Sequence, residues 1–173
     1  MIVALVGNGP SKSLFHRKPE YNLVCGFNFA RDKYLDRIFI SDPGVSKRMV
    51  LPNFKDTRID IIEKEKKRVF KGAMNISKNT SQVAYMKLLR EGAKEFHIFG
   101  HDLMWADDYT SESDKHSPKD AWVVKAKQNN LRSYWMKYWS EIITVPTYIH
   151  MPENQSLNFK SEFVNEVFYQ QST

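Results

Sequence analysis

A glycine turn directly after the first apolar run holds the residue types best suited to chemistry. It reads Gly7, Asn8, Gly9, Pro10 and Ser11. The glycines allow positive φ and close backbone approach, the proline pre-sets φ for a first helical turn, and free amides at such a turn point toward an anion. The segment predicts a phosphate-binding turn, with a nucleotide as the leading ligand. The alternative is a glycine turn that only joins a strand to a helix.

Small or polar residues also follow three later apolar runs. They are Asn28, the segment Ser41 to Pro43, which contains Asp42, and the segment Gly100 to Asp102. Ligands of open α/β sheets bind beyond the carboxyl ends of the strands. We therefore expect these segments and the glycine turn to meet at one site.

The elements that must position these residues follow from the spacing of apolar side chains. Apolar runs bounded by Gly, Pro or Asp predict strands at residues 2–6, 23–27, 37–40, 96–99 and 142–145. A helix is predicted from Asn79 or Thr80 to Gly92, and it leads into the strand at 96–99. A helix followed by a buried strand is typical of a crossover unit. The sequence predicts one α/β domain over residues 1–173, a Rossmann-like, mostly parallel sheet with helices on both faces.

The remaining segments give weaker patterns. Residues 56–71 contain a mixed-sign charge run typical of an exposed helix face, and residues 157–168 have helical spacing. A polar stretch over about 103–118 predicts a lid-like loop. A helix over residues 120–139 ends in an aromatic face, for which we expect core packing or a contact between subunits of a homo-oligomer.

Composition restricts the compartment and the partners. The chain has 173 residues, a formal net charge of +6 and one cysteine, Cys25. The charge suits an anionic partner such as a nucleotide, a charged glycan, nucleic acid or an anionic membrane. Cys25 lies in an apolar run and is expected to be a buried small hydrophobe. The first residues begin a strand without a basic leader, and no apolar run approaches the roughly 18 residues that cross a bilayer. We expect a cytoplasmic protein without a transmembrane segment.

Taken in order, these motifs resemble the bacterial CMP-sialic-acid-dependent sialyltransferases, a family of Rossmann-like glycosyltransferases. The opening Gly-Asn-Gly-Pro-Ser is also similar, more distantly, to that of pterin pyrophosphokinase-like proteins. The resemblance rests on that opening, Phe27-Asn28, Ser41-Asp42-Pro43, Asn79-Thr80-Ser81, the stretch from Gly92 to Asp102, His116-Ser117, and the close from Pro152 to Leu157.

The resemblance implies roles in binding the nucleotide sugar. The turn residues Asn8, Gly9 and Ser11, with Gly7 and Pro10 shaping the turn, would contact the nucleotide phosphate or ribose. Thr80 and Ser81 would bind the carboxylate of the donor sugar through the helix amino end. Sugar or phosphate groups would be held by Asn28 and Asp42, and the nucleoside would be lined by Gly100, His101 and Asp102.

The resemblance also implies a metal-independent transfer with no cofactor beyond the nucleotide sugar. His116 would be the general base that takes a proton from the acceptor hydroxyl, because the pKa of imidazole lies near working pH. Tyr109 would stand for one of the tyrosines that stabilise the leaving phosphate. The acceptor is a glycan or another hydroxyl compound that the residues do not identify.

Three positions depart from the family pattern. Met104 stands where the family has a tyrosine, Asp42 replaces an asparagine, and Gln82 replaces a glycine beside the donor sugar. Met104 cannot donate a proton to a phosphate, and the charge of Asp42 would repel one unless a basic group lies beside it. Gln82 is expected to crowd the donor.

Several functions therefore stay open. The first is a sialyltransferase-like enzyme that moves a sugar, most directly from a CMP-sugar, to an acceptor hydroxyl. The second is a non-catalytic protein that binds or sequesters a nucleotide, which the loss of the tyrosine favours. The third is a Mg²⁺-dependent pyrophosphokinase-like enzyme using Asp42, Asp102 or Asp107. An alternative metal cluster would consist of His101, Asp102, Asp107 and Asp108. Nucleic-acid binding is the least favoured function.

Overall fold

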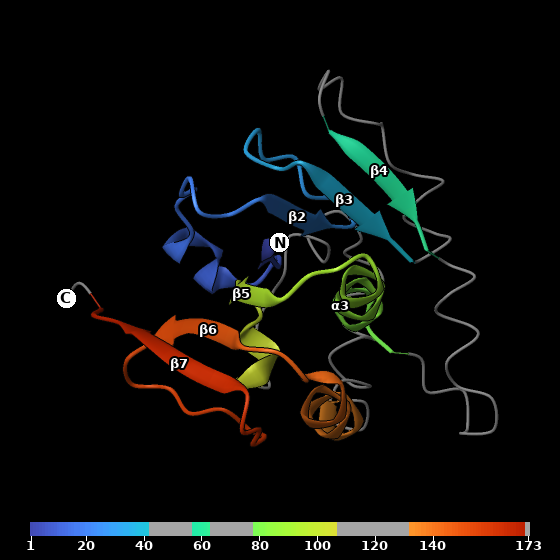
Figure 1. The fold of residues 1–173 in the computed structure, drawn as a ribbon. Coiled ribbons are helices and arrows are strands. Elements are labelled where there is room, and N and C mark those ends of the chain that lie inside the picture. Colours follow the sequence, from blue (N-terminus) through green and yellow to red (C-terminus); the bar gives the residue numbers. More distant parts are fainter. Residues whose placement is uncertain (42–56, 63–77, 107–131, 172–173) are drawn as a thin grey trace, which may run out of the picture.

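The chain forms a seven-stranded sheet in the order β4-β3-β2-β1-β5-β6-β7 (Figure 1). A computed structural model describes residues 1–41, 57–62, 78–106 and 132–171. Every neighbouring pair of strands is parallel. This arrangement confirms the predicted Rossmann-like α/β fold.

The elements follow one another as strands with helical segments between some of them. The strands are β1 (Ile2–Val6), β2 (Leu23–Phe27), β3 (Arg37–Ile40), β4 (Arg58–Ile61), β5 (Glu95–Phe99), β6 (Thr147–Pro152) and β7 (Val164–Tyr169). The helical segments are the 3-10 helices η1 (Pro10–Leu14) and η2 (Asp102–Met104), the α-helix α3 (Thr80–Arg90), and the α-helical residues 132–142. The strands predicted at 2–6, 23–27, 37–40 and 96–99 are confirmed.

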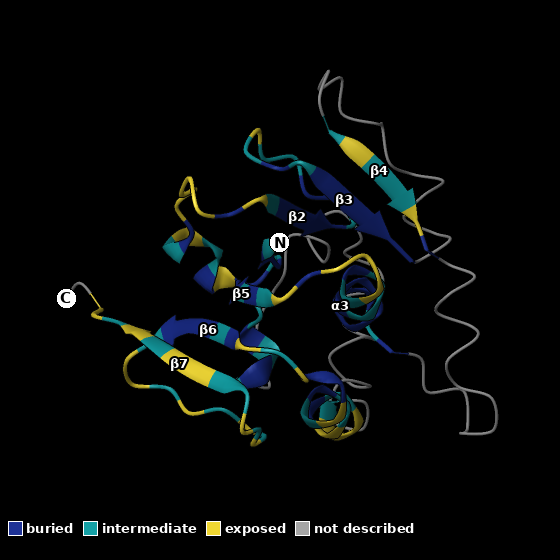
Figure 2. Ribbon diagram, viewed as in Figure 1, coloured by how far each residue is buried: buried dark blue, intermediate teal, exposed yellow. Residues whose placement is uncertain are grey.

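Alternate side chains of the central strands serve two separate cores. In β1, Val3 and Leu5 belong to the core beneath α3 and residues 132–142, whereas Ala4 and Val6 belong to the core on the other face. The period of two arises because successive strand side chains point to opposite faces. Cys25 is fully buried, as predicted, and burial raises the pKa of its thiol. Figure 2 shows the buried central strands and the more exposed outer strands β4 and β7.

Local sequence signals fix both ends of α3. Asn79 is the N-cap, and its side chain accepts a hydrogen bond from the Gln82 amide while the Gln82 side chain accepts one from the Asn79 amide. Such a capping box satisfies two amides that a helix leaves free. At the other end Gly92 has φ +101°, a left-handed conformation that glycine adopts without steric cost. In the part of the chain that the structure describes, no helix is both long enough and apolar enough to span a membrane.

The strand predicted at 142–145 is wrong. Ile142 is the last of the helical residues 132–142, and the Ile143 amide donates to the Trp139 carbonyl, 3.1 Å away. Both isoleucines are buried, so the apolar run marks a helix end entering the core. Short apolar runs do not distinguish a buried strand from a buried helix segment. The strand begins later, with β6.

The helical interpretation of residues 157–168 is also wrong, because the chain there ends in β7. Within the described sheet this outer strand pairs only with β6, and it is half exposed, which suits its mixture of polar and apolar residues. The start of the segment 56–71 is not helical, because Arg58–Ile61 form β4 at the opposite edge of the sheet. The charge run itself, at residues 63–68, stays a prediction. Residues 63–71 lie outside the described residues.

The aromatic face near the end of the predicted helix packs partly into the core. Trp139 is 1% exposed and meets Tyr85 of α3 edge-to-face, with ring centroids 5.8 Å apart. Tyr134 on the same helix is 50% exposed. Trp139 therefore joins the two helices on this face of the sheet.

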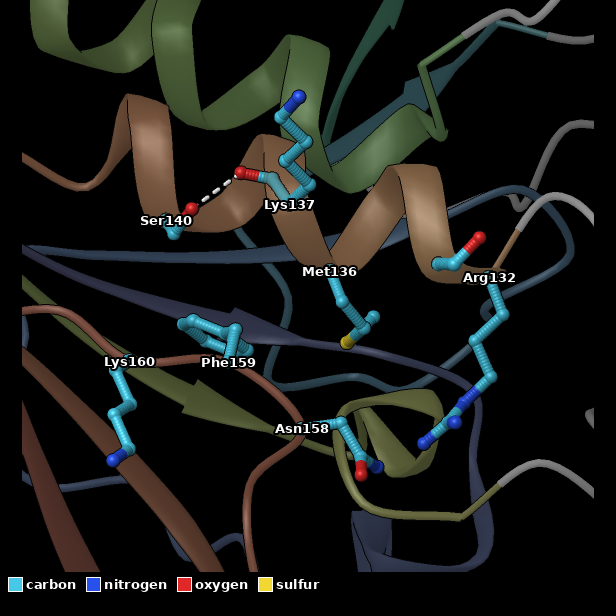
Figure 3. A pocket seen from close by; sticks show the side chains of 8 residues that line it. Arg132, Met136, Lys137, Ser140, Asn158, Phe159 and Lys160 are labelled. Carbon is cyan, nitrogen blue, oxygen red and sulfur yellow. Dashed lines mark hydrogen bonds between the residues drawn. The ribbon is translucent and has the colours of Figure 1, made fainter.

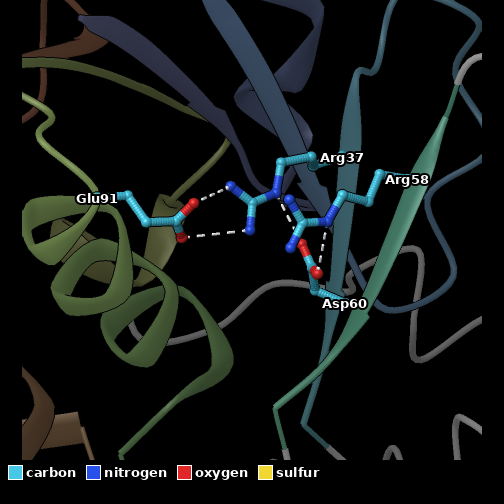
Figure 4. A network of polar contacts seen from close by, with 4 residues as sticks. All are labelled: Arg37, Arg58, Asp60 and Glu91. Atoms are coloured by element: carbon cyan, nitrogen blue, oxygen red, sulfur yellow. Dashed lines mark hydrogen bonds and ion pairs between the residues drawn. The ribbon is translucent and has the colours of Figure 1, made fainter.

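An ion-pair network joins β3, β4 and the end of α3 (Figure 4). Arg37 is 5% exposed; its Nε donates to Asp60 at 2.7 Å and its Nη1 to Glu91 at 2.8 Å. Arg58 also donates to Asp60, at 2.9 Å, but its side chain is 61% exposed. The buried guanidinium thus ties the helix to two strands, and the exposed one only borders the network.

Arg37→Met is expected to lower the free energy of unfolding by about 3 kcal/mol, because it leaves the largely buried Asp60 carboxylate without its main partner. Arg58→Met is the matched control on the same carboxylate and is expected to cost less than about 1 kcal/mol, since solvent screens exposed pairs. Urea denaturation measures both. Equal losses for the two variants would contradict this account of the network.

Candidate functional site

The candidate site lies where the strand order reverses. From β1 the chain moves to β2 on one side, whereas β5, which follows α3, pairs with the other side of β1. In doubly wound sheets such a switch point opens a crevice beyond the carboxyl ends of the two strands. The residues that follow β1 and β5 here are the predicted Gly7–Ser11 and Gly100–Asp102.

The turns after β1 and β5 cross in direct backbone contact. The Gly7 amide donates to Phe99 O at 2.7 Å, and the Gly9 amide donates to Gly100 O at 2.9 Å. A Cβ on Gly7 would lie 2.5 Å from Gly100 O, and one on Gly100, whose φ is +66°, would overlap Gly7 O. These glycines are therefore needed for the close approach of the two turns.

The carboxylate of Asp102 occupies the start of η1. The Ser11 hydroxyl donates to Asp102 Oδ1 at 2.6 Å, and the Ser11 amide lies 3.2 Å from both carboxylate oxygens. Burial raises the pKa of Asp102, and the hydrogen bonds from Ser11 oppose that shift. A Cβ on Gly9 would collide with the same carboxylate. In this structure the amide and hydroxyl of Ser11, at the end of the glycine turn, thus bind the carboxylate of Asp102.

Two side-chain hydrogen bonds attach the start of α3 to the strand ends. Ser41, just after β3, lies 2.5 Å from Thr80 between the hydroxyl oxygens. The Ser81 hydroxyl lies 2.5 Å from Nε2 of His101, just after β5. The first amides of any α-helix lack intrahelical partners and favour negative charge. The predicted residues Thr80 and Ser81 are thus held between the carboxyl ends of β3 and β5.

His101 is held as a neutral imidazole. Its Nδ1 donates to Phe99 O at 2.7 Å, so Nε2 accepts the proton of the Ser81 hydroxyl. Burial lowers the pKa of His101 to about 4, while the hydrogen bond to Phe99 acts in the opposite direction. His101 therefore carries no charge at neutral pH and fixes the direction of the Ser81 hydroxyl.

Asn8 and Asn28, which follow β1 and β2, each carry a buried oxygen without a hydrogen-bond partner among the described residues. The Asn8 amide nitrogen donates to Phe27 O at 2.9 Å, which brings this side chain to the end of β2. The Oδ1 atoms of Asn8 and Asn28 are both buried and accept no hydrogen bond from the described residues. Asn28 also has φ +56°, a left-handed conformation uncommon outside glycine. Buried acceptors without a partner are uncommon in native proteins.

The structure thus brings most of the predicted binding residues to one end of the sheet. They are Gly7, Asn8, Gly9, Pro10, Ser11, Asn28, Thr80, Ser81, Gly100, His101 and Asp102. Asp42, Tyr109 and His116 lie outside the described residues, as does most of the predicted lid-like loop. Of that loop, η2 and the turn at Trp105 are described.

Two of the residues that depart from the family pattern, Met104 and Gln82, are buried in the structure. Met104 is 1% exposed and belongs to the core beneath α3. Gln82 is fully buried, and its side chain is bonded to the Asn79 amide and to Trp135 O, at 3.1 and 2.8 Å. The side-chain amide of Gln82 is therefore bonded within the protein interior.

Among the described residues there is no group of three His, Cys, Asp or Glu side chains placed to hold a metal ion. Asp107 and Asp108 of the alternative metal cluster lie outside that part of the chain. Sequence analysis did not find the Ser11–Asp102 and Ser81–His101 pairs. Residues 11 and 102 come from distant parts of the chain, and neither spacing nor residue type signals their contact.

Comparisons of the chain with protein-family models, with curated proteins and with solved structures found no match in any of the three.

Ser11→Ala is expected to lower the free energy of unfolding by about 1–3 kcal/mol, because it removes the hydroxyl donor from a buried carboxylate. Ser13→Ala is the matched control two residues away. The Ser13 hydroxyl is exposed, and among the described residues it bonds only to Pro10 O, at 3.4 Å, so its loss should change stability by less than about 0.5 kcal/mol. Thermal or urea unfolding measures both, and a Ser11 variant as stable as the Ser13 variant would show that the Asp102 contact contributes little.

Proposed function

We propose that the chain binds a nucleotide at the crevice beyond β1, β2 and β5, and that it uses a nucleotide sugar, most directly a CMP-sugar, as the donor in a metal-independent transfer to an acceptor hydroxyl. In that reaction the bond between the sugar and the phosphate breaks, the acceptor oxygen bonds to the sugar, and the nucleotide leaves. His116 takes the acceptor proton. The compartment proposed for this activity is the cytoplasm.

The unfilled acceptors of Asn8 and Asn28 are the observation that carries the proposal. A buried acceptor without a partner costs about 1–3 kcal/mol, which a ligand recovers by donating a hydrogen bond. Ribose hydroxyls and the exocyclic amine of cytosine are such donors. A bare phosphate fits less well, because most of its oxygens are acceptors at neutral pH. The pair therefore favours a nucleoside over an inorganic anion.

The start of α3 supports the anionic part of the same ligand. The amides of Thr80 and Ser81 lie at the positive end of the helix dipole, which favours a phosphate or a carboxylate. The Ser81 hydroxyl donates its hydrogen bond to Nε2 of His101, so the backbone amides of Thr80 and Ser81 are the donors that remain. Because Asp102 engages Ser11, we place the anion nearer to α3 than to η1.

Nucleotide binding without transfer is the second candidate function. The burial of Met104 favours it, because this position cannot present a proton donor to a leaving phosphate. The pyrophosphokinase-like alternative depends on Asp42 and Asp107 as metal ligands, since Asp102 is bonded to Ser11. Magnesium dependence separates it from the other two.

Calorimetric titration with CMP, with UMP, AMP and GMP as comparisons, tests the proposed binding. We expect CMP to bind without metal and Asn8→Ala to weaken that binding about ten-fold, because one buried hydrogen bond is lost. Asn165→Ala, on the exposed side of β7, is the matched control and should bind like the unchanged chain. Absence of nucleotide binding both without metal and with Mg²⁺ would make the glycine turn a simple connector.

The same preparation then separates binding from transfer. With a CMP-sugar and a panel of hydroxyl acceptors, His116→Ala should abolish transfer while the affinity for CMP changes little. Equal loss of both would assign His116 a structural role. CMP binding without transfer to any acceptor would favour the non-catalytic candidate, and binding only with Mg²⁺ would favour the pyrophosphokinase-like one.

A further inference from the structure

A groove of about 460 Å³ lies between the helical residues 132–142 and the segment 157–160 (Figure 3). It contains none of the residues assigned to the nucleotide crevice. Among the described residues that line it, the charged ones are Arg132, Lys137 and Lys160. The lining thus carries three positive charges and no carboxylate, so its electrostatic potential favours an anion.

Arg132 is held in place with part of its hydrogen-bonding capacity unused. Its Nε donates to Leu103 O at 2.9 Å, which fixes the guanidinium against η2. Its Nη2 is buried and has no hydrogen-bond partner among the described residues. Figure 3 shows this guanidinium directed toward Asn158 across the groove. A buried donor without a partner is unfavourable, and a carboxylate or phosphate oxygen is the acceptor that a guanidinium binds best.

The opposite wall is fixed to the same element. The Asn158 amide donates to Met104 O at 2.9 Å, and its side-chain nitrogen does so at 3.3 Å. Both walls are therefore attached to the end of η2, whose first residue, Asp102, belongs to the nucleotide crevice. The groove is thus a built feature that borders the crevice through η2.

The rest of the lining suits an organic ligand. Met136 is buried and Phe159 is half-buried, and they supply an apolar surface between the charged side chains. Ser133 and Ser140 add hydroxyl groups, and the Ser140 hydroxyl donates to Lys137 O at 2.5 Å. An anion with an apolar or ring portion fits this combination better than a small inorganic ion.

We propose that this groove is a second ligand site, which binds a small organic anion through a carboxylate or phosphate group placed against Arg132. Lys137 and Lys160 at its sides add attraction that depends on salt, because exposed charges are screened. The site is separate from the nucleotide crevice, and its occupation does not depend on the activity proposed above.

Amide NMR titration at low salt tests the site with three probes. Benzoate carries a carboxylate on a ring, phenyl phosphate carries a phosphate, and benzamide is the neutral counterpart of benzoate. We expect benzoate or phenyl phosphate to bind with a Kd near or below about 1 mM and to shift the amides of residues 132–142 and 157–160. Benzamide should bind at least about ten-fold more weakly. The stronger of the two anions tells whether the natural ligand carries a carboxylate or a phosphate.

Variants decide which residues form the site. Arg132→Gln should weaken binding about ten-fold or more. Because this change also removes the contact with Leu103, the exposed pair Lys137→Glu and Lys160→Glu provides a second test that leaves the fold intact. We expect these to weaken binding several-fold, while Lys94→Gln, an exposed lysine outside the groove, should have no effect. The proposal would be overturned if benzamide bound as tightly as benzoate, or if the lysine variants bound the anions as tightly as the unchanged chain. Shifts confined to residues 7–11 and 80–81 would also overturn it.

Discussion

The close crossing of the turns after β1 and β5 is the constraint on which the rest of the structure depends. Gly7, Gly9 and Gly100 allow the backbones to touch, and the Asp102 carboxylate then reaches Ser11 at the start of η1. This contact joins the two strands at the switch point of the sheet. Any side chain on these glycines would push the turns apart and separate the residues of the crevice.

The elements around this crossing leave one region of the crevice polar and incompletely bonded. The start of α3 is bonded to the ends of β3 and β5 through Thr80 and Ser81. Asn8, bonded to Phe27 O, and Asn28 carry buried oxygens that accept no hydrogen bond from the described residues. A rigid frame around unfilled acceptors is the arrangement expected of a preorganised binding site.

The sequence predicted the elements with the strongest local signals. The inner strands are continuous apolar runs because both of their faces are buried, and α3 has a capping box and a glycine after its end. The outer strand β7 was missed because one of its faces is solvated, and residues 142–145 were misassigned because Ile142 and Ile143 enter the core from a helix. Local patterns report burial more reliably than they report the type of element.

The candidate site was predictable in position but not in detail. Parallel strands place their carboxyl ends together, so Asn8, Asn28 and Gly100 were expected to meet. The bonds of Asp102 to Ser11 and of His101 to Ser81 were not predictable. They are side-chain contacts between residues that are distant in the sequence and meet at the switch point. The guanidinium of Arg132 in the groove is similarly fixed by η2, which no local pattern indicated.

A crystal structure of the chain with CMP tests the central claim most directly. The account predicts that the nucleotide lies beyond β1, β2 and β5 and donates hydrogen bonds to the buried oxygens of Asn8 and Asn28, with its phosphate near the start of α3. A nucleotide bound elsewhere, or bound in the crevice with both asparagine oxygens still unfilled, would contradict it.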